Sequence, residues 1–546
     1  MTDNEPVRFK GETLQPLTIG VVDGLRDKEE GVLSWLGVPY AEPPVGEARW
    51  KSPAPVKPWT GIRSARRFAM PCAQMRDGEM IGSEDCLYLN VWRPDHTRTG
   101  LPVWVYVHGG GNQNGSGEDF CGDRLAVGVD GIVVSINYRL GPFGWFSWSG
   151  LSTGDAENDS GNYGLLDIFQ ALRWVREHIS SFGGDPDNVT LAGQSAGARN
   201  ILASFISPCA EGLYHKSTVF SGGMTLASKA QGEAYAEKLL SKLVMKDRYE
   251  ANTIEARRYL HNLSQEDKAA YARGKSAEEL LLHCEPAEIR MEAFPHLFMD
   301  GFVIPEEGFN RLGQGKYIKV PLMLGCTMDE FAGFIFNNDI FAEYAQNPLK
   351  QADSKEAALY GKANSFGSRL YAGFNADEVA EALAGNRDQP FIYVYRFAWR
   401  PSAAFSGGVL AALGSTHGAD MDFWSGHTNH WLAEIPGESY YSEADKPGRA
   451  KLTHAMSAYL KRFLREGSPN GELGLPEWEP WNSKEGGATA MILDADRNEV
   501  KLHMSREKYD SGKILDEMAT VLSDEEHELI AERLFKGRFF WEGKFK

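Results

Sequence analysis

The sequence lacks several features that would point to particular functions. No stretch of about 18 apolar residues is present, so no segment is long enough to cross a membrane as a helix. Basic charge is also scarce: 57 Lys and Arg residues stand against 75 Asp and Glu residues, which gives a formal net charge of −18. Binding of nucleic acid requires basic patches that neutralise phosphates. We therefore expect no membrane span and no nucleic-acid partner.

Cysteines are few and widely spaced. The six cysteines form no Cys-x-x-Cys pair and show no metal-ligand spacing, which disfavours a metal centre. The first residues, MTDNEPVRFKGETLQPLTIG, lack the basic and apolar regions of a secretory signal. The sequence therefore favours a cytoplasmic protein, or a secreted one whose leader was removed, and it calls for no metal and no cofactor.

Short β-like runs alternate with helical patterns along the chain, without internal repeats or low-complexity linkers. Residues 164–184, GLLDIFQALRWVREHISSFGG, place apolar side chains at steps of three and four and then end in two glycines, which is typical of a helix with one buried face. This alternation predicts the α/β class: one domain over residues 1–546, with a central, mostly parallel twisted sheet flanked by helices. The expected strands are 103–111, 131–139, 189–192, 217–222, 320–325 and 391–397.

Two polar segments with helical patterns, residues 228–300 and 340–385, interrupt this alternation. We expect them to form helical insertions over the C-terminal edge of the sheet and to shape the substrate pocket. A further amphipathic helix is expected at 449–466.

The most informative short pattern is Gly193-Gln194-Ser195-Ala196-Gly197, between the β-like run VTLA and a helical stretch. A sharp strand-to-helix turn strains the backbone at the serine, so small residues flank it. The turn exposes the hydroxyl, with helix N–H groups directed at it. The alternative is a small-residue turn that serves packing only, and the correct placement between strand and helix favours a nucleophile.

A serine nucleophile also needs a base, an acid that orients the base, and an oxyanion hole. The sequence HGGGN, residues 108–112, follows a strand upstream of the serine. Glycines allow backbone N–H groups to approach a developing oxyanion, although such a loop can also be merely flexible. We interpret these glycines as an oxyanion loop.

Longer motifs carry a specific resemblance to a known family. GVPYAEPPVGEARW (37–50) and SEDCLYLNVW (83–92) resemble the two N-terminal signatures of the type-B carboxylesterases, the cholinesterase/carboxylesterase family of the α/β-hydrolase fold. NYRLGPFGW, FGGDPDNVTLAGQSAGA and GLYHKSTVFSGG follow in the order of that family, nearly end to end. The resemblance implies a serine enzyme that hydrolyses carboxylic esters, with a small-molecule ester as its partner.

The resemblance also implies the remaining catalytic groups. The acid of the family corresponds to Glu330 in LGCTMDEFAGF, and neighbouring Asp329 is the alternative. The base of the family corresponds to His417 in GSTHGADMDFW. The catalytic triad is then Ser195, Glu330 and His417. Backbone N–H groups form the oxyanion hole, and they belong to Gly110, Gly111 and Ala196.

Other histidines lack the motif of the base. His427 and His430 have no following glycine, and we interpret them as loop or surface residues. By resemblance, His108 shapes the oxyanion loop rather than acting as a base.

Residues that differ from the family pattern limit the range of possible substrates. Gln194 stands where the family usually has glutamate, and the loop between Cys72 and Cys86 contains no tryptophan that could hold a quaternary ammonium. Both differences disfavour choline esters. Asn112 and its polar neighbours suggest a substrate with polar groups, unless they form a solvated turn. We assign Asn112 and Gln194 to substrate binding and expect a small to medium, polar ester.

The resemblance implies structural pairs as well. Arg49 with Glu84 and Arg139 with Asp185 correspond to buried ion pairs of the family, and Cys72 with Cys86 to its N-terminal disulfide. The aromatic and basic C-terminal stretch LFKGRFFWEGKFK is expected to pack on the body of the protein rather than on a partner or membrane.

Three functions are compatible with these motifs. The first is ester hydrolysis. The second is acyl transfer, or lactone formation or opening, with the same serine. The third is a non-catalytic binding role, which the intact serine, acid, base and glycine loop disfavour.

Overall fold

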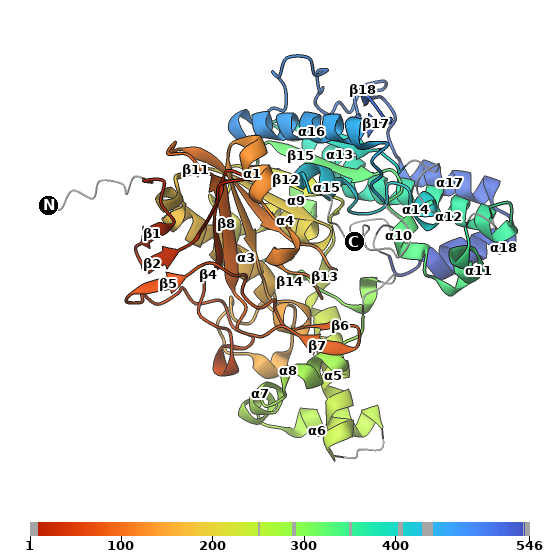
Figure 1. Cartoon of the computed structure of the whole chain (residues 1–546). Helices are drawn as coiled ribbons and strands as arrows, with labels where there is room; N and C mark the ends of the chain where they lie inside the picture. Colours follow the sequence, from red (N-terminus) through yellow and green to blue (C-terminus); the bar gives the residue numbers. More distant parts are fainter. Residues whose placement is uncertain are drawn as a thin grey trace.

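The computed structural model describes residues 9–248, 252–286, 291–348, 352–401, 408–427, 440–538 and 540. Within these residues an eleven-stranded sheet runs through the centre of the molecule (Figure 1). Its strands in spatial order are β18 (Val500–Ser505), β17 (Ala490–Ala495), β16 (Ile392–Phe397), β15 (Leu322–Thr327), β12 (Lys216–Phe220), β11 (Gly184–Gln194), β9 (Leu101–Val107), β10 (Ile132–Ile136), β8 (Tyr88–Pro94), β4 (Val32–Pro39) and β3 (Leu25–Asp27).

The centre of this sheet is parallel from β17 to β10, and antiparallel strands complete both edges. Every residue of β9, β10, β12, β15 and β16 is buried. A parallel sheet covered on both faces requires such continuous apolar strands. The predicted strands therefore exist, with ends that differ by a few residues from the expected ones.

The register brings the carboxyl ends of neighbouring strands to one edge of the sheet. Gly193 of β11 pairs with Val107 of β9, and Gln194 pairs with Phe220 of β12. Phe220 in turn lies opposite Gly325 of β15. The loops that follow β9, β11, β12 and β15 consequently meet at this edge, where ligands bind in open α/β sheets.

Helices flank the sheet, as the sequence predicts. Helix α3 (Tyr163–His178) ends earlier than its apolar pattern, because residues Ile179–Phe182 tighten into a 3₁₀ turn. Gly183 then adopts a left-handed conformation with φ of 82°, which a residue without Cβ accepts most easily. Helix α16 (Lys446–Glu466) contains the expected segment 449–466 and contacts α1 (Asp123–Val129).

The two predicted insertions are helical. The first contains α5 (Lys229–Arg248), α6 (Thr253–Asn262), α7 (Gln265–Arg273) and α8 (Ala277–Leu282), which form a lobe at the bottom of Figure 1. The second contains α11 (Ala342–Gln346), α12 (Lys355–Ala372) and α13 (Glu378–Ala384). Helices α11 and α12 lie in a second lobe with α17 (Ser511–Val521) and α18 (Asp524–His527). Their effect on substrate choice stays a prediction.

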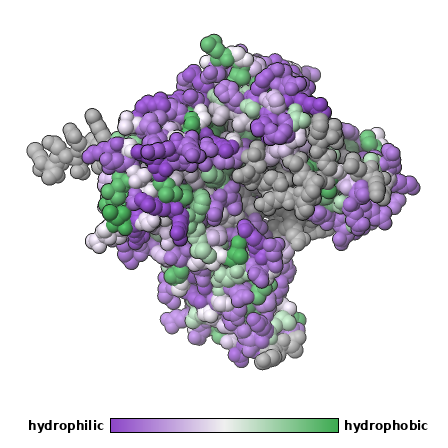
Figure 2. All heavy atoms as spheres, viewed as in Figure 1, coloured by the Kyte–Doolittle hydropathy of each residue, from purple (hydrophilic) through white to green (hydrophobic). Residues whose placement is uncertain are grey.

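Polar residues cover most of the face drawn in Figure 2, and apolar residues occur there in small scattered groups. No helix among the described residues is both long enough and apolar enough to cross a membrane.

Of the two ion pairs that the resemblance implies, the structure contains Arg49–Glu84 but not Arg139–Asp185. Arg49 Nε donates to Glu84 Oε2 at 2.7 Å, as expected. Arg139 does not pair with Asp185. Its guanidinium donates to both carboxylate oxygens of Asp167, from Nε at 2.8 Å and Nη2 at 2.7 Å. Asp167 lies on the buried face of α3, whereas the Asp185 carboxylate accepts a hydrogen bond from a backbone N–H in its own turn.

Cysteines 72 and 86 are joined by a disulfide, as the resemblance implied. The C-terminal segment packs on its own body: the Phe535 and Phe540 rings lie 5.0 and 5.6 Å from the Phe331 ring, between centroids. Its remaining residues, 539 and 541–546, lie outside the described part of the chain.

Candidate active site

Ser195 stands at a strained turn between β11 and helix α4 (Ala196–Ile206). Its backbone has φ of 56° and ψ of −118°, a conformation that side-chain-bearing residues rarely adopt. A Cβ at Gly197 would lie 2.1 Å from the Val107 carbonyl oxygen, and one at Gly193 would lie 2.7 Å from the Gly197 backbone. The two glycines are therefore required by close packing at the turn.

The glycine loop follows β9 and lies against this turn. A Cβ at Gly109 would come within 2.9 Å of the Ser195 Cβ. Gly110 and Gly111 have φ of 89° and 64°, and within the described residues neither N–H donates a hydrogen bond to another protein group. The Ala196 N–H is at the first position of α4, where helical N–H groups have no partner inside the helix. These three N–H groups are available to an oxyanion.

His417 and Glu330 are brought together from distant parts of the sequence. His417 Nδ1 lies 2.5 Å from Glu330 Oε2, and Glu330 is fully buried. The other carboxylate oxygen, Oε1, accepts hydrogen bonds from the Ser221 hydroxyl and from the Thr327 N–H, the latter at 2.8 Å. Glu330 is thus fixed in one orientation, and it points its second oxygen at the imidazole.

Two aromatic rings enclose the imidazole. The Phe334 ring centroid lies 4.8 Å and the Tyr371 centroid 5.8 Å from that of His417. The Tyr371 hydroxyl donates to the Ser221 carbonyl at 3.0 Å, so the ring is anchored to the loop after β12. This packing limits the rotation of His417.

The structure does not join Ser195 and His417 by a hydrogen bond. Over the described residues, the side-chain neighbour of His417 Nε2 is instead Gln194, whose Nε2 lies 3.1 Å away. Gln194 immediately precedes Ser195, so the imidazole faces the elbow. Hydrogen bonds of a catalytic serine are often long or misaligned without substrate.

The alternative acid and base lie elsewhere. Asp329 forms a two-pronged ion pair with Arg400, at 2.6 Å from Nε and 2.9 Å from Nη2, and also accepts from the Ser415 N–H. His427 is hydrogen-bonded to Asp123 at the start of α1. His430 lies outside the described residues.

Asn112 requires a correction, because the structure does not place it where it could meet a substrate. Its side chain is fully buried and exchanges hydrogen bonds with the Asn200 amide at 3.0 and 2.9 Å. The Tyr138 hydroxyl donates to the same Asn112 oxygen at 3.0 Å. Asn112 therefore fixes the glycine loop to α4, and the polar neighbours in the sequence gave no signal of this burial.

His108 has the supporting role that the resemblance implied. Its ring stacks on Tyr138 with centroids 4.5 Å apart, and its Nδ1 lies 3.0 Å from the Gly109 carbonyl oxygen. Burial lowers the pKa of this imidazole, which stays neutral in the interior.

Two residues near the imidazole were missed by sequence reasoning. Ser221 and Tyr371 position Glu330 and His417, and no motif marks either of them. Asp420, two residues after Gly418, is fully buried, and burial raises its pKa to about 6. Arg538, at the far C-terminus of the chain, stacks on Phe334 with Cζ 4.2 Å from the ring centroid. Such contacts join segments that have no fixed spacing in the sequence.

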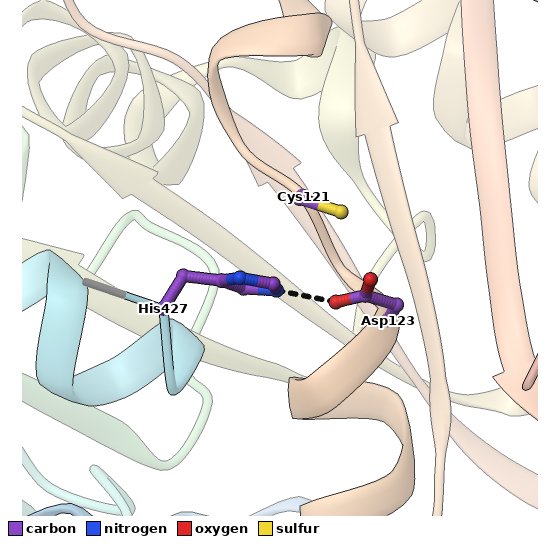
Figure 3. A group of neighbouring side chains, drawn as sticks. All are labelled: Cys121, Asp123 and His427. Carbon is purple, nitrogen blue, oxygen red and sulfur yellow. Dashed lines mark hydrogen bonds and ion pairs between the residues drawn. The ribbon is translucent and has the colours of Figure 1, made fainter. Parts of the chain in front are cut away.

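One group of side chains away from this edge has the composition of a metal site. Potential ligand atoms of Cys121, Asp123 and His427 lie within 4.8 Å of one another (Figure 3). The hydrogen bond between His427 and Asp123 satisfies both groups, and burial raises the pKa of the Cys121 thiol to about 11. The chemistry of an activated serine makes no use of this group.

A parallel sheet that carries a strained serine elbow, a glycine loop and a buried Glu–His pair along one edge defines an α/β-hydrolase. The solved structure of a PNB esterase matches this chain with a TM-score of 0.70 at 29% identity, covering 92% of this chain and 100% of that one. The chain belongs to the carboxylesterase family, whose model matches residues 12–354 and 336–511. It is therefore an esterase that acts on carboxylic esters.

Two relatives show how far the similarity extends. The chain is 33% identical over 467 residues to the para-nitrobenzyl esterase of Bacillus subtilis, which covers 81% of this chain and 88% of that protein. It is 29% identical over 522 residues to liver carboxylesterase 1 of Oryctolagus cuniculus, with coverage of 87% and 88%.

Proposed function

We propose that the chain hydrolyses its esters through an acyl-enzyme on Ser195, with His417 as base and Glu330 as the acid that orients it. The observation that carries this proposal is the buried Glu330–His417 hydrogen bond directly beside the strained serine elbow. A carboxylate at Nδ1 holds the tautomer whose Nε2 can accept a proton, and it stabilises the imidazolium that forms.

The reaction begins when His417 Nε2 exchanges the Gln194 amide for the Ser195 hydroxyl. Nε2 takes the hydroxyl proton as Oγ bonds to the carbonyl carbon, and the carbonyl oxygen becomes an oxyanion. The N–H groups of Gly110, Gly111 and Ala196 receive this charge. Loss of one such donor typically lowers the rate by roughly 10²–10³.

The imidazolium then returns its proton to the alcohol oxygen, and the C–O bond of the ester breaks. Water attacks the acyl-enzyme while its proton passes to Nε2. The second tetrahedral intermediate collapses, the carboxylic acid leaves, and Ser195 recovers its proton.

For the substrate we propose a small to medium ester with polar groups, and not a choline ester. The chain between Cys72 and Cys86 has no tryptophan to hold a quaternary ammonium, and Gln194 supplies no negative charge beside the serine. Because Asn112 is buried, Gln194 is the remaining polar contact of the two that the sequence predicted.

The same serine machinery serves acyl transfer or lactone chemistry when an alcohol replaces water. A non-catalytic binding role is disfavoured by the strain at Ser195, because a turn that costs about 1–3 kcal/mol serves no purpose in a mere adhesion surface.

A fluorophosphonate probe tests the nucleophile, with wild type compared to Ser195→Ala. We expect wild type to be labelled and the variant not, and a p-nitrophenyl ester series to give the preferred acyl length. Absence of label on folded wild type would contradict the proposal. Analysis of products with and without added alcohols separates hydrolysis from acyl transfer.

A further inference from the structure

Arg538 is a buried cation that has no counter-ion among the described residues. Its side chain is 1% exposed, and its Nε and Nη1 have no hydrogen-bond partner. Among the described residues no carboxylate forms an ion pair with it. The guanidinium lies between two rings, with Cζ 4.2 Å from the Phe334 centroid and 5.4 Å from that of Phe331. Burial lowers the pKa of this guanidinium to about 9.

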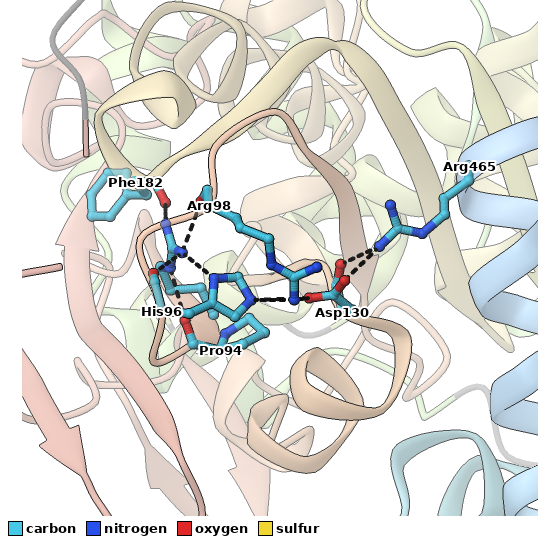
Figure 4. Close-up of polar contacts among 7 residues, drawn as sticks. Pro94, His96, Arg98, Asp130, Phe182 and Arg465 are labelled. Atoms are coloured by element: carbon cyan, nitrogen blue, oxygen red, sulfur yellow. Dashed lines mark hydrogen bonds and ion pairs between the residues drawn. The ribbon is translucent and has the colours of Figure 1, made fainter. Parts of the chain in front are cut away.

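Other buried arginines show how this chain normally treats such a group. Arg93 is fully buried, and its guanidinium donates to the carbonyl oxygens of Pro94, Phe182, His96 and Arg98. Figure 4 shows these carbonyl groups, together with the ion pairs that Arg98 and Arg465 form with Asp130. A buried charge without hydrogen-bond partners costs free energy of folding. Because Arg538 lacks the carbonyl partners that Arg93 has, we expect a ligand to supply them.

The isolated guanidinium lies next to the proposed catalytic base. Both groups contact the Phe334 ring: the Arg538 Cζ lies 4.2 Å and the His417 ring centroid 4.8 Å from the Phe334 centroid. The charge of Arg538 also reaches the Tyr371 hydroxyl, on the second ring that encloses His417.

A second arginine adds positive charge from the nucleophile side. Arg199 is on α4 one turn after Ser195, and its N–H donates to the Ser195 carbonyl at 3.1 Å. Its side chain is buried, and its charge acts on both Tyr371 and Arg538. Two like charges are thus gathered at the site of a protein with a net charge of −18.

Among the described residues no carboxylate neutralises Arg538. Glu330 and Asp420 are the buried carboxylates near the imidazole. The two Glu330 oxygens are engaged by His417, Ser221 and Thr327, and Asp420 Oδ2 accepts from the Tyr395 hydroxyl. The matching ligand is a carboxylate, because a guanidinium binds its two oxygens through parallel N–H groups.

We propose that the preferred substrate is an ester that carries a free carboxylate, bound by Arg538 with support from the field of Arg199. This inference rests on the proposed function, because it assigns a substrate class to the same site. The carboxylate replaces the missing hydrogen bonds of Arg538 while Ser195 attacks the ester carbonyl.

Two matched pairs of esters test the proposal. Monoethyl glutarate and ethyl valerate differ by a carboxylate in the acyl part, and γ-acetoxybutyrate and butyl acetate differ by one in the alcohol part. We expect kcat/KM of wild type to favour the anionic member of at least one pair by about ten- to a hundredfold, the usual strength of a hydrogen bond to a charged group.

Variants of Arg538 test whether this residue causes the preference for the anionic ester. Arg538→Gln should lower this preference by about tenfold or more, and Arg538→Lys, which keeps a charge but not the fork, by less. The matched control is Arg93→Gln, a buried arginine outside the site, which should leave the ratio unchanged. If Arg538→Gln fails to fold, glutarate as an inhibitor of wild-type ethyl valerate hydrolysis replaces it, with neutral glutaramide as the comparison.

A preference for the neutral esters in both pairs, or inhibition by glutaramide as strong as by glutarate, overturns the proposal. An anionic preference that survives in folded Arg538→Gln does so too. Failure of the proposed function is distinct: neither member of any pair would then be hydrolysed, and the fluorophosphonate would not label Ser195.

Discussion

Gln194 Nε2 lies 3.1 Å from His417 Nε2, so the residue before the nucleophile is hydrogen-bonded to the nitrogen that must accept the serine proton. An amide nitrogen is only a donor, which makes this imidazole nitrogen the acceptor and leaves the ring proton on Nδ1. The Nδ1 proton points to Glu330. The contact therefore maintains the neutral tautomer that a general base requires.

Replacing Gln194 by Glu should change the pH dependence of the reaction. A carboxylate beside the imidazole favours its protonated form, which cannot act as a base. We expect the acid limb of the kcat/KM profile to move to higher pH by about one unit. The control Gln194→Leu removes the hydrogen bond without adding charge, so its acid limb should not move upward. An unchanged profile in Gln194→Glu would show that residue 194 does not contact the base.

Glu330 and Asp329 are neighbours with different expected effects. Glu330→Gln should lower kcat by about 10³–10⁴, because the amide no longer holds the imidazole tautomer or stabilises the imidazolium. Asp329→Asn should lower kcat by less than about tenfold, since the Asp329 carboxylate faces Arg400. Steady-state kinetics of both variants, with circular dichroism as a check on folding, measure this. Equal losses would contradict the assignment of the acid.

The corrected partner of Arg139 gives a stability prediction. Asp167→Asn leaves a buried guanidinium without its counter-charge and should cost about 3–5 kcal/mol of unfolding free energy. Asp185 is partly exposed at the beginning of β11, and Asp185→Asn should change the unfolding free energy by less than about 0.5 kcal/mol. Urea unfolding followed by fluorescence compares the two variants. A larger loss at Asp185 would favour the pairing that the resemblance implied.

Asp420 should make stability depend on pH. The Tyr395 hydroxyl donates to Asp420 Oδ2 at 2.5 Å, but Oδ1 has no hydrogen-bond partner in the part of the chain that the structure describes. Burial raises the pKa of Asp420 to about 6. In the unfolded chain the pKa of an aspartate is about 3.9. Between about pH 4 and pH 6 the folded state therefore holds a proton that the unfolded state has lost, and stability falls as pH rises through this window.

Asp420→Asn removes this linkage. Relative to wild type, its unfolding free energy should rise between about pH 4 and pH 6, by on the order of 2–3 kcal/mol, and stay constant above. Asp496→Asn is the control, because backbone N–H groups of Asn498 and Glu499 lower the pKa of the Asp496 carboxylate to about 2. Its linkage has the opposite sign and lies below about pH 4, so its difference from wild type should be flat between about pH 4 and pH 6. Thermal unfolding of wild type and both variants between about pH 4 and pH 6 measures these differences. If the difference between Asp420→Asn and wild type does not change with pH, the linkage is refuted.

The serine turn between β11 and α4 could be predicted from the sequence, because the residues of a short stretch determine most of it. Gly193 is required by a contact within its own strand–turn–helix unit, and Gly197 by the close approach of Val107 on the neighbouring strand β9. The apolar residues of the strands mark them in the sequence whichever elements pack on them. Parallel strands end at one edge, so the residues after β9, β11 and β15 had to meet there. The order of the motifs and their similarity to a family supplied Glu330 and His417.

The tertiary structure alone decided which distant groups are neighbours. Arg139 pairs with Asp167 and not with Asp185, and the buried Asn112 exchanges hydrogen bonds with Asn200. Arg538 and His417, far apart in the sequence, both contact the Phe334 ring. Local steric requirements depend on a few adjacent residues, so they can be recognised in the sequence. The environment of a buried charge depends on segments that lie hundreds of residues apart, and only folding brings these segments together.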